Sequence, residues 1–157
     1  MSEKVWLQPQ IIDRTQIILD SFKGLLGYEL ISREKDLTTQ AEELFKADFV
    51  VVAHGIENDP IFDYGNQTAL DLWVMDWKQF TQTPSKATVE PSIREAREIM
   101  LQQVATRGYL DNYGGVRISS SGRKFYIREA IIWNLTDNLG NKCGQAATFS
   151  DWQFLEQ

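Results

Sequence analysis

The residues best suited to acid–base chemistry lie near the chain's single histidine, His54. It ends the apolar run FVVVAH, and Asp59 and Asp63 follow it closely. A nucleophile such as Ser119 or Cys143 would complete a triad, but the chain has no Gly-x-Ser-x-Gly elbow that would present one. We therefore expect His54 to end a strand and to bond a backbone group of the following turn. We expect no enzyme activity.

Metal binding is disfavoured by the same set of residues. One histidine and one cysteine, far apart in the sequence, fall short of the ligand sets that usually hold zinc. A single cysteine also allows no disulfide within the chain, so an oxidising compartment is not implied. We expect Cys143 to be a small residue of the core or of a sheet.

Two arginines, Arg117 and Arg128, are candidates for ligand binding. They lie in the stretch GVRISSSGRKFYIREAIIWN, which predicts two strands joined by a Ser-Ser-Gly turn. A planar guanidinium group suits a carboxylate or a phosphate on a ligand. The alternatives are that the arginines pair with acids such as Glu129, Glu95 or Asp71, or that they lie at the rim of the domain.

Strict alternation along the second of these strands divides its side chains between two faces. One face carries Arg128, Ala130, Ile132 and Asn134, and the other carries Phe125, Ile127, Ile131 and Trp133. Both faces are half apolar, so we expect the strand to be covered on both sides. On the last strand Gly144 and Ala146 share a face, and their small side chains would leave room beside Arg128.

The elements that would position these residues begin with helices. Apolar residues repeat at helical spacing from Pro9 to Leu30, and Gly27 is a plausible end. A second, shorter helix is predicted from Leu37 to Lys46. The first helix has one wide apolar stripe, which includes Ile11, Ile18, Leu19, Phe22 and Leu25. Such a stripe must be buried, either on the chain's own sheet or against a partner.

Strands follow the two helices. Phe49–His54 and Ile61–Tyr64 predict a hairpin across an Asn-Asp-Pro turn, and Asn66 is placed to cap the helix that carries Trp73. The last third predicts three more strands, at Tyr113–Ser119, Arg123–Thr136 and Lys142–Phe149. Trp73 and Trp133 are expected in the core.

Composition limits the classes of protein. The 157 residues, 43% of them hydrophobic, fit one domain over residues 1–157, with an N-terminal helix at about 9–30 and a core at about 37–155. A net charge of −6 disfavours nucleic acid as a partner. No apolar run approaches the roughly 18 residues of a membrane span, and the N-terminus has no signal-peptide core. We expect no membrane partner and a cytoplasmic location.

The order of elements resembles that of PAS domains, which have two strands, a group of small helices and a three-stranded meander. IFDYGNQTAL resembles the PAS stretch in which a strand ends at the asparagine that starts the first helix, here Asn66. AIIWNLTDNLGNKCGQAATFSDW resembles the PAS ending, with an Asp-x-x-Gly turn at Asp137 and Gly140 and a final aspartate at Asp151.

A closer resemblance is to the MEKHLA domain family, which is PAS-related. The strings GNQTALDLW, GVRISSSGRKFYIREAIIWN and GQAATFSDW carry it, and it covers roughly residues 10–155. The family occurs at the C-terminus of plant homeodomain–leucine zipper regulators and as free-standing bacterial proteins, and this chain resembles the free-standing bacterial form. The resemblance implies an α+β, PAS-like fold. Its five-stranded antiparallel sheet would have helices on one face and an extra N-terminal helix.

The function that the resemblance implies is sensory or regulatory. In PAS domains one face of the sheet lines a ligand cavity, and we expect a small acidic molecule there. The expected ligand-binding residues are Arg117, Arg128, Asn134, Ala146, His54 and Asn66. The alternative is a ligand-free module that forms a homodimer or docks to a larger protein partner. No cofactor is assigned, and flavin adduct chemistry is not expected because the Asn-Cys-Arg-type string of photochemical PAS domains is missing.

Overall fold

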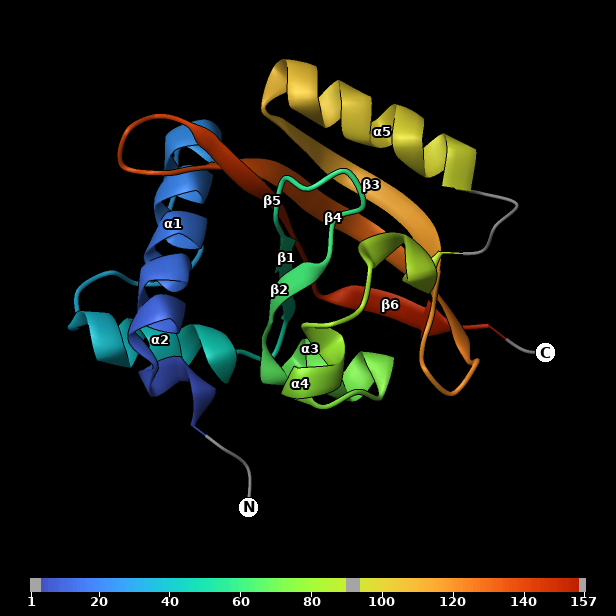
Figure 1. Cartoon of the computed structure of the whole chain (residues 1–157), viewed down its shortest axis with the longest axis horizontal. Helices are drawn as coiled ribbons and strands as arrows, with labels where there is room; N and C mark the ends of the chain where they lie inside the picture. The colour runs from blue at the N-terminus through green and yellow to red at the C-terminus, as the bar shows by residue number, and fades with distance from the viewer. Residues whose placement is uncertain (1–3, 90–93, 156–157) are drawn as a thin grey trace.

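The computed structural model describes residues 4–89 and 94–155. Its elements are, in order, η1 (Val5–Leu7), α1 (Pro9–Leu26), α2 (Leu37–Phe45), β1 (Val50–His54), β2 (Phe62–Gly65), α3 (Gln67–Trp73), α4 (Trp77–Phe80), η2 (Ser85–Thr88), α5 (Arg94–Arg107), β3 (Tyr109–Ile118), β4 (Lys124–Thr136), β5 (Lys142–Phe149) and β6 (Asp151–Phe154). Figure 1 shows α1 and α2 together at one side of the molecule, with α5 running beside β3.

One antiparallel sheet joins the strands in the order β2-β1-β5-β4-β3. This confirms the predicted α+β fold with its five-stranded antiparallel sheet. A sixth strand, β6, was not predicted, and it pairs with the first half of β4. It forms because the chain continues along β4 after β5 ends, with Arg128 opposite Asp151.

The bounds of two elements differ from the prediction by more than one residue. Helix α1 ends at Leu26 rather than near residue 30, and the end suggested at Gly27 is confirmed, because that glycine adopts the left-handed conformation (φ 86°) that stops a helix. Strand β3 begins at Tyr109 rather than Tyr113, because the chain enters the sheet directly after Gly108 (φ 93°), which follows α5. None of the helices in the described part of the chain is both long and apolar enough to cross a membrane.

Different helices cover the two faces of the sheet. On one face, the ring of Phe22 in α1 lies edge-on to Trp133, with ring centroids 4.9 Å apart, and the indole Nε1 of Trp133 donates to the carbonyl of Ile18 at 3.2 Å. On the other face, Val104 of α5 packs against Ile132, the neighbour of Trp133. Apart from Leu25, which is 36% exposed, the predicted apolar stripe of α1 is thus buried within the chain, and Trp133 is a core residue as predicted.

Asn66 joins the first hairpin to α3 and α2. Its side-chain oxygen accepts from the N–H groups of Ala69 and Val51, each at 3.1 Å. Its amide nitrogen donates to the carbonyls of Leu44 at 3.1 Å and Phe49 at 2.8 Å. The predicted cap is confirmed, and the side chain is fully buried, with all four of these bonds made to backbone groups.

Candidate functional site

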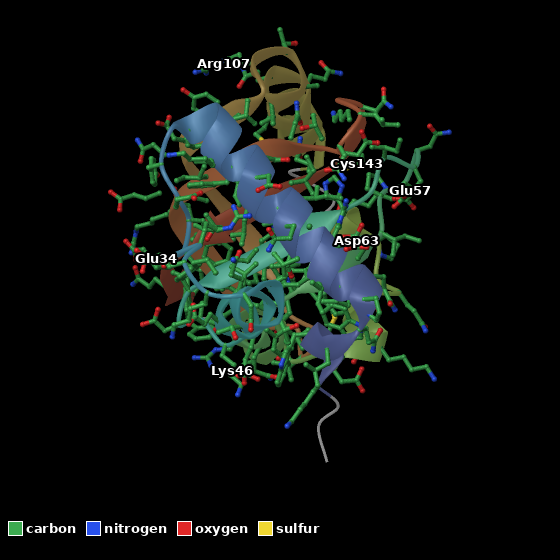
Figure 2. All side chains as sticks on the ribbon, turned by 90° about the vertical axis from the view of Figure 1, so that its left-hand side faces the viewer. Glu34, Lys46, Glu57, Asp63, Arg107 and Cys143 are labelled. Atoms are coloured by element: carbon green, nitrogen blue, oxygen red, sulfur yellow. The ribbon has the colours of Figure 1, made fainter. Side chains whose placement is uncertain are left out.

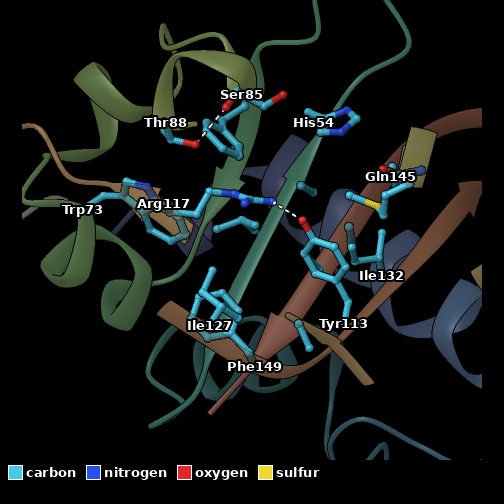
Figure 3. A pocket seen from close by; sticks show the side chains of 17 residues that line it. His54, Trp73, Ser85, Thr88, Tyr113, Arg117, Ile127, Ile132, Gln145 and Phe149 are labelled. Atoms are coloured by element: carbon cyan, nitrogen blue, oxygen red, sulfur yellow. Dashed lines mark hydrogen bonds between the residues drawn. The ribbon is translucent and has the colours of Figure 1, made fainter. Parts of the chain in front are cut away.

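A cavity of about 70 Å³ lies between the sheet and the elements α3, η2 and α5. Most of its wall is apolar. The apolar lining residues are Val52, Ala53, Phe62, Trp73, Met100, Ile127, Ala130, Ile132, Ala146, Ala147 and Phe149. The polar ones are His54, Ser85, Thr88, Tyr113, Arg117 and Gln145. Figure 3 shows Arg117 and Tyr113 approaching one another across this space.

Arg117 brings a positive charge to the cavity. It is half-buried, and its guanidinium group donates to the Tyr113 hydroxyl at 3.3 Å and to the Val116 carbonyl at 3.0 Å. The guanidinium carbon also lies 5.7 Å from the centre of the Tyr113 ring. Among the residues that the structure describes, no carboxylate forms an ion pair with Arg117. Both of its hydrogen-bond partners are uncharged.

A β-bulge in β4 determines which side chains face this cavity. Between the pairs Gly115–Ile127 and Tyr113–Ala130, strand β4 advances by three residues while β3 advances by two. Glu129 sits in this extra step with φ 54°, a left-handed conformation that strand residues rarely adopt. Ile127 and Ala130 therefore both face the cavity, although strict alternation puts them on opposite faces.

The prediction that Arg128 faces the cavity is consequently wrong. The bulge leaves its side chain on the opposite face, where it pairs with Asp151 at 3.4 Å and also bonds Gln153 of β6. Its side chain is 44% exposed. The acids considered from the sequence are not these partners, and the side chain of Glu95 lies outside the described residues.

The other predicted site residues are divided between the cavity and the rest of the fold. His54 and Ala146 line the cavity, but Ala146 is paired with Trp133, so its side chain shares the α1 face and only its backbone borders the space. Asn134 is not among the lining residues; it donates to the Val104 carbonyl at 3.1 Å and ties β4 to α5. Asn66 is likewise absent from the lining.

Sequence reasoning missed several cavity residues. Tyr113 lies four residues before Arg117 on the same strand, so alternation alone could have placed them on one face. Ala147, rather than Ala146, is the small residue of β5 on the cavity face, because it pairs with Ile132. Ser85 and Thr88 come from η2, and no local pattern indicated that this turn would reach the sheet.

His54 ends β1, as predicted. Its Nδ1 lies 2.9 Å from the carbonyl oxygen of Gly55. A carbonyl oxygen can only accept, so this bond requires the proton on Nδ1. The predicted bond to a turn backbone group is thereby confirmed.

Arg14 of α1 holds the backbone behind His54 in place. Its guanidinium group pairs with Asp63 at 2.7 Å and donates to the His54 carbonyl at 3.1 Å. It also contacts the carbonyl and sulfur of Cys143. Loss of hydration raises the pKa of Asp63, and the Arg14 charge opposes that rise. Figure 2, which faces α1, shows Asp63 and Cys143 beside the same stretch of this helix.

The cavity does not fit a flavin. An engineered cavity of about 150 Å³ holds a single benzene ring, whereas a flavin has three fused rings. Cys143, the residue that would form an adduct, contacts Arg14 beneath α1 and is not among the described residues that line the cavity.

Comparison with protein families gives one match over most of the chain. The model of the MEKHLA domain matches residues 12–154. Among curated proteins, Homeobox-leucine zipper protein ATHB-15 of Arabidopsis thaliana is 21% identical over 139 residues, which are 88% of this chain and 17% of that protein. HOX29 of Oryza sativa subsp. indica is 23% identical over 152 residues, 94% of this chain and 18% of that protein. The chain thus spans less than a fifth of each of these relatives.

Solved structures show the same fold. The PAS domain of a protein from Colwellia psychrerythraea has a TM-score of 0.63 at 12% identity, covering 76% of this chain and 96% of that one. A light-oxygen-voltage domain studied with a flavin analogue has a TM-score of 0.56 at 14% identity, covering 76% and 86%. At such identities the likeness extends to the fold alone.

Proposed function

Because this chain belongs to the MEKHLA domain family, we propose that it is a non-catalytic sensory or regulatory module whose cavity binds a small acidic molecule. The observation that carries the proposal is Arg117, a cation that reaches a largely apolar cavity with no described carboxylate beside it. A guanidinium group removed from water needs a compensating charge, and a bound carboxylate would supply one through two parallel hydrogen bonds.

An unsatisfied donor at the same cavity supports a ligand that has an acceptor oxygen. Trp73 lines the cavity, and its buried indole N–H has no hydrogen-bond partner among the described residues. Buried donors in native proteins nearly always find an acceptor, so one without a partner calls for an explanation. A ligand oxygen would satisfy the indole of Trp73 as well as the guanidinium of Arg117.

The cavity volume limits the size of the ligand. If about 150 Å³ holds the six carbons of benzene, about 70 Å³ holds about three or four heavy atoms. Formate and acetate are in this range, and the methyl group of acetate suits a wall of Ile127, Ala147 and Phe149. Acetate is the natural first probe.

We expect Arg117→Gln to weaken acetate binding by about 10- to 100-fold, since a hydrogen bond to a charged group contributes about 1.5–3 kcal/mol. The measurement is a titration with acetate followed by the backbone amide NMR shifts of cavity residues. Arg128→Gln is the matched control, because it removes the same group from the adjacent strand but on the opposite face. Equal loss in both variants, or no saturable shift in the unsubstituted chain, would contradict the proposal.

A second candidate function is a ligand-free module that docks to another copy of the chain. The observation that favours it is an exposed aromatic ring on the sheet face of β4 and β6 that is turned away from the cavity. There Tyr126 is 37% exposed and lies beside Arg128 and Gln153. Native mass spectrometry of protein purified from its own host separates the two functions. A retained small acid supports the first, and a stable dimer without a bound molecule supports the second.

A further inference from the structure

A second hollow lies against the cavity, on the outside of the molecule. It is an open groove of about 300 Å³. The residues that line it are His54, Gly55, Ile56, Glu57, Pro60, Lys142, Gly144 and Gln145. Of the described residues that line the cavity, His54 and Gln145 alone also line this groove. These two residues therefore form the wall that the cavity shares with the groove.

The two wall residues form one cross-strand pair. His54, at the end of β1, is opposite Gln145 of β5, so their side chains lie next to each other on the cavity face. Figure 3 places both at the side of the cavity away from Trp73. Gln145 is buried and donates to the Asn134 side chain at 3.3 Å, whereas the ring of His54 is half-buried.

The backbone behind this pair has little freedom to move. A Cβ atom on Gly144 would lie 2.3 Å from the His54 carbonyl oxygen, so the two strands are in close contact there. The same carbonyl accepts from Arg14, which is itself paired with Asp63. An opening in this wall must therefore come from rotation of side chains. The half-buried ring of His54 lines the groove, and it can turn only if its Nδ1 bond to the Gly55 carbonyl breaks.

The groove carries one charge of each sign, from Lys142 and Glu57. Lys142 lines it, and no described carboxylate forms an ion pair with this lysine. The acid in the groove, Glu57, uses a carboxylate oxygen to accept the Ile61 N–H at 2.7 Å.

We propose that small carboxylates enter the cavity from this groove, past the side chain of His54, which acts as the gate. The inference rests on the proposed function for the identity of the ligand. The route itself is independent of that identity, because it concerns where the cavity exchanges with solvent.

The test places a thiol in the cavity and measures how fast a small acid reaches it. Ala130, 2% exposed and on the cavity face, is replaced by Cys in a Cys143→Ser background. Iodoacetate is the probe: the thiolate sulfur attacks the methylene carbon, the S–C bond forms, the C–I bond breaks and iodide leaves. Mass spectrometry follows the labelling rate under native conditions. Ala147→Cys, also on the cavity wall, is the second position if the first variant does not fold.

The gate predicts opposite effects of two changes at one residue. His54→Ala is expected to speed labelling by about tenfold and His54→Trp to slow it by about tenfold, each corresponding to about 1.4 kcal/mol in the barrier to entry. Met100→Ala opens the α5 wall of the cavity instead. Asn138→Ala, in the exposed turn between β4 and β5 and in the lining of neither hollow, is the control and should leave the rate unchanged. Acceleration by Met100→Ala without any response at His54 would overturn the route, as would an unlabelled thiol in His54→Ala.

Charge preference separates failure of the route from failure of the ligand. Iodoacetamide is a neutral reagent of nearly the same shape, and the ratio of its rate to that of iodoacetate is compared with the ratio for free glutathione. An unchanged ratio, with rates that still depend on His54, would refute the acidic ligand and support the route. A preference for iodoacetate, with rates that do not depend on His54, would support the acidic ligand and refute the route.

Discussion

Replacing Asn66 by alanine is expected to lower the free energy of unfolding by about 3 kcal/mol, because it removes a helix cap and leaves buried backbone groups without partners. The side chain is fully buried, and it serves the N–H groups of Val51 and Ala69 and the carbonyls of Leu44 and Phe49. Water cannot replace these bonds without opening the joint between β1, α2 and α3. The measurement is urea denaturation, monitored by circular dichroism.

Asn138→Ala is the control for this experiment, since Asn138 lies exposed in the turn between β4 and β5 and should change stability by less than about 0.5 kcal/mol. Acetate affinity distinguishes the structural role of Asn66 from the ligand contact that sequence reasoning suggested. The folded fraction of Asn66→Ala should bind acetate as the unsubstituted chain does. A variant with unchanged stability and lost acetate binding would restore the sequence-based assignment.

The contrast between Asn66 and Arg128 shows what local patterns can predict. The cap at Asn66 depends on the residues immediately around it, and the hairpin and helix on either side fix its conformation. The face of Arg128 depends on a bulge whose left-handed residue is Glu129. Glycine is the usual signal for such a conformation, so a glutamate gives no indication of it. Every residue beyond the bulge then changes face relative to strict alternation.

The cavity illustrates a second limit of sequence reasoning. Its wall combines β1, β3, β4 and β5 with α3, η2 and α5, so its volume depends on how far apart these elements pack. A pattern of apolar residues indicates that a face is buried but does not give the width of the space beside it. Arg117 could be assigned to the cavity face from the sequence, whereas the small size of the cavity and the adjoining groove could not.

Replacing Phe22 by alanine is expected to lower the free energy of unfolding by about 4 kcal/mol, the largest effect predicted for this chain. Phe22 is 1% exposed, and its ring lies edge-on to those of Trp133 and Tyr28. Its removal leaves a void between α1 and the sheet that neighbouring helix and strand atoms cannot fill. The loss of the ring also leaves α1 less firmly packed at Ile18, whose carbonyl accepts the Trp133 indole N–H.

Leu25→Ala is the matched control, because Leu25 belongs to the same predicted stripe but is 36% exposed. Burial on the chain's own sheet predicts a cost of less than about 1 kcal/mol there, roughly in proportion to the smaller area removed from water. Urea denaturation at two protein concentrations, combined with light scattering, tests the arrangement. If the stripe instead bound a second copy, the stability of the unsubstituted chain would rise with concentration, and Phe22→Ala would halve the scattering mass. Burial within one chain requires the opposite result: the free energy of unfolding is independent of concentration, and the Phe22→Ala deficit is the same at both.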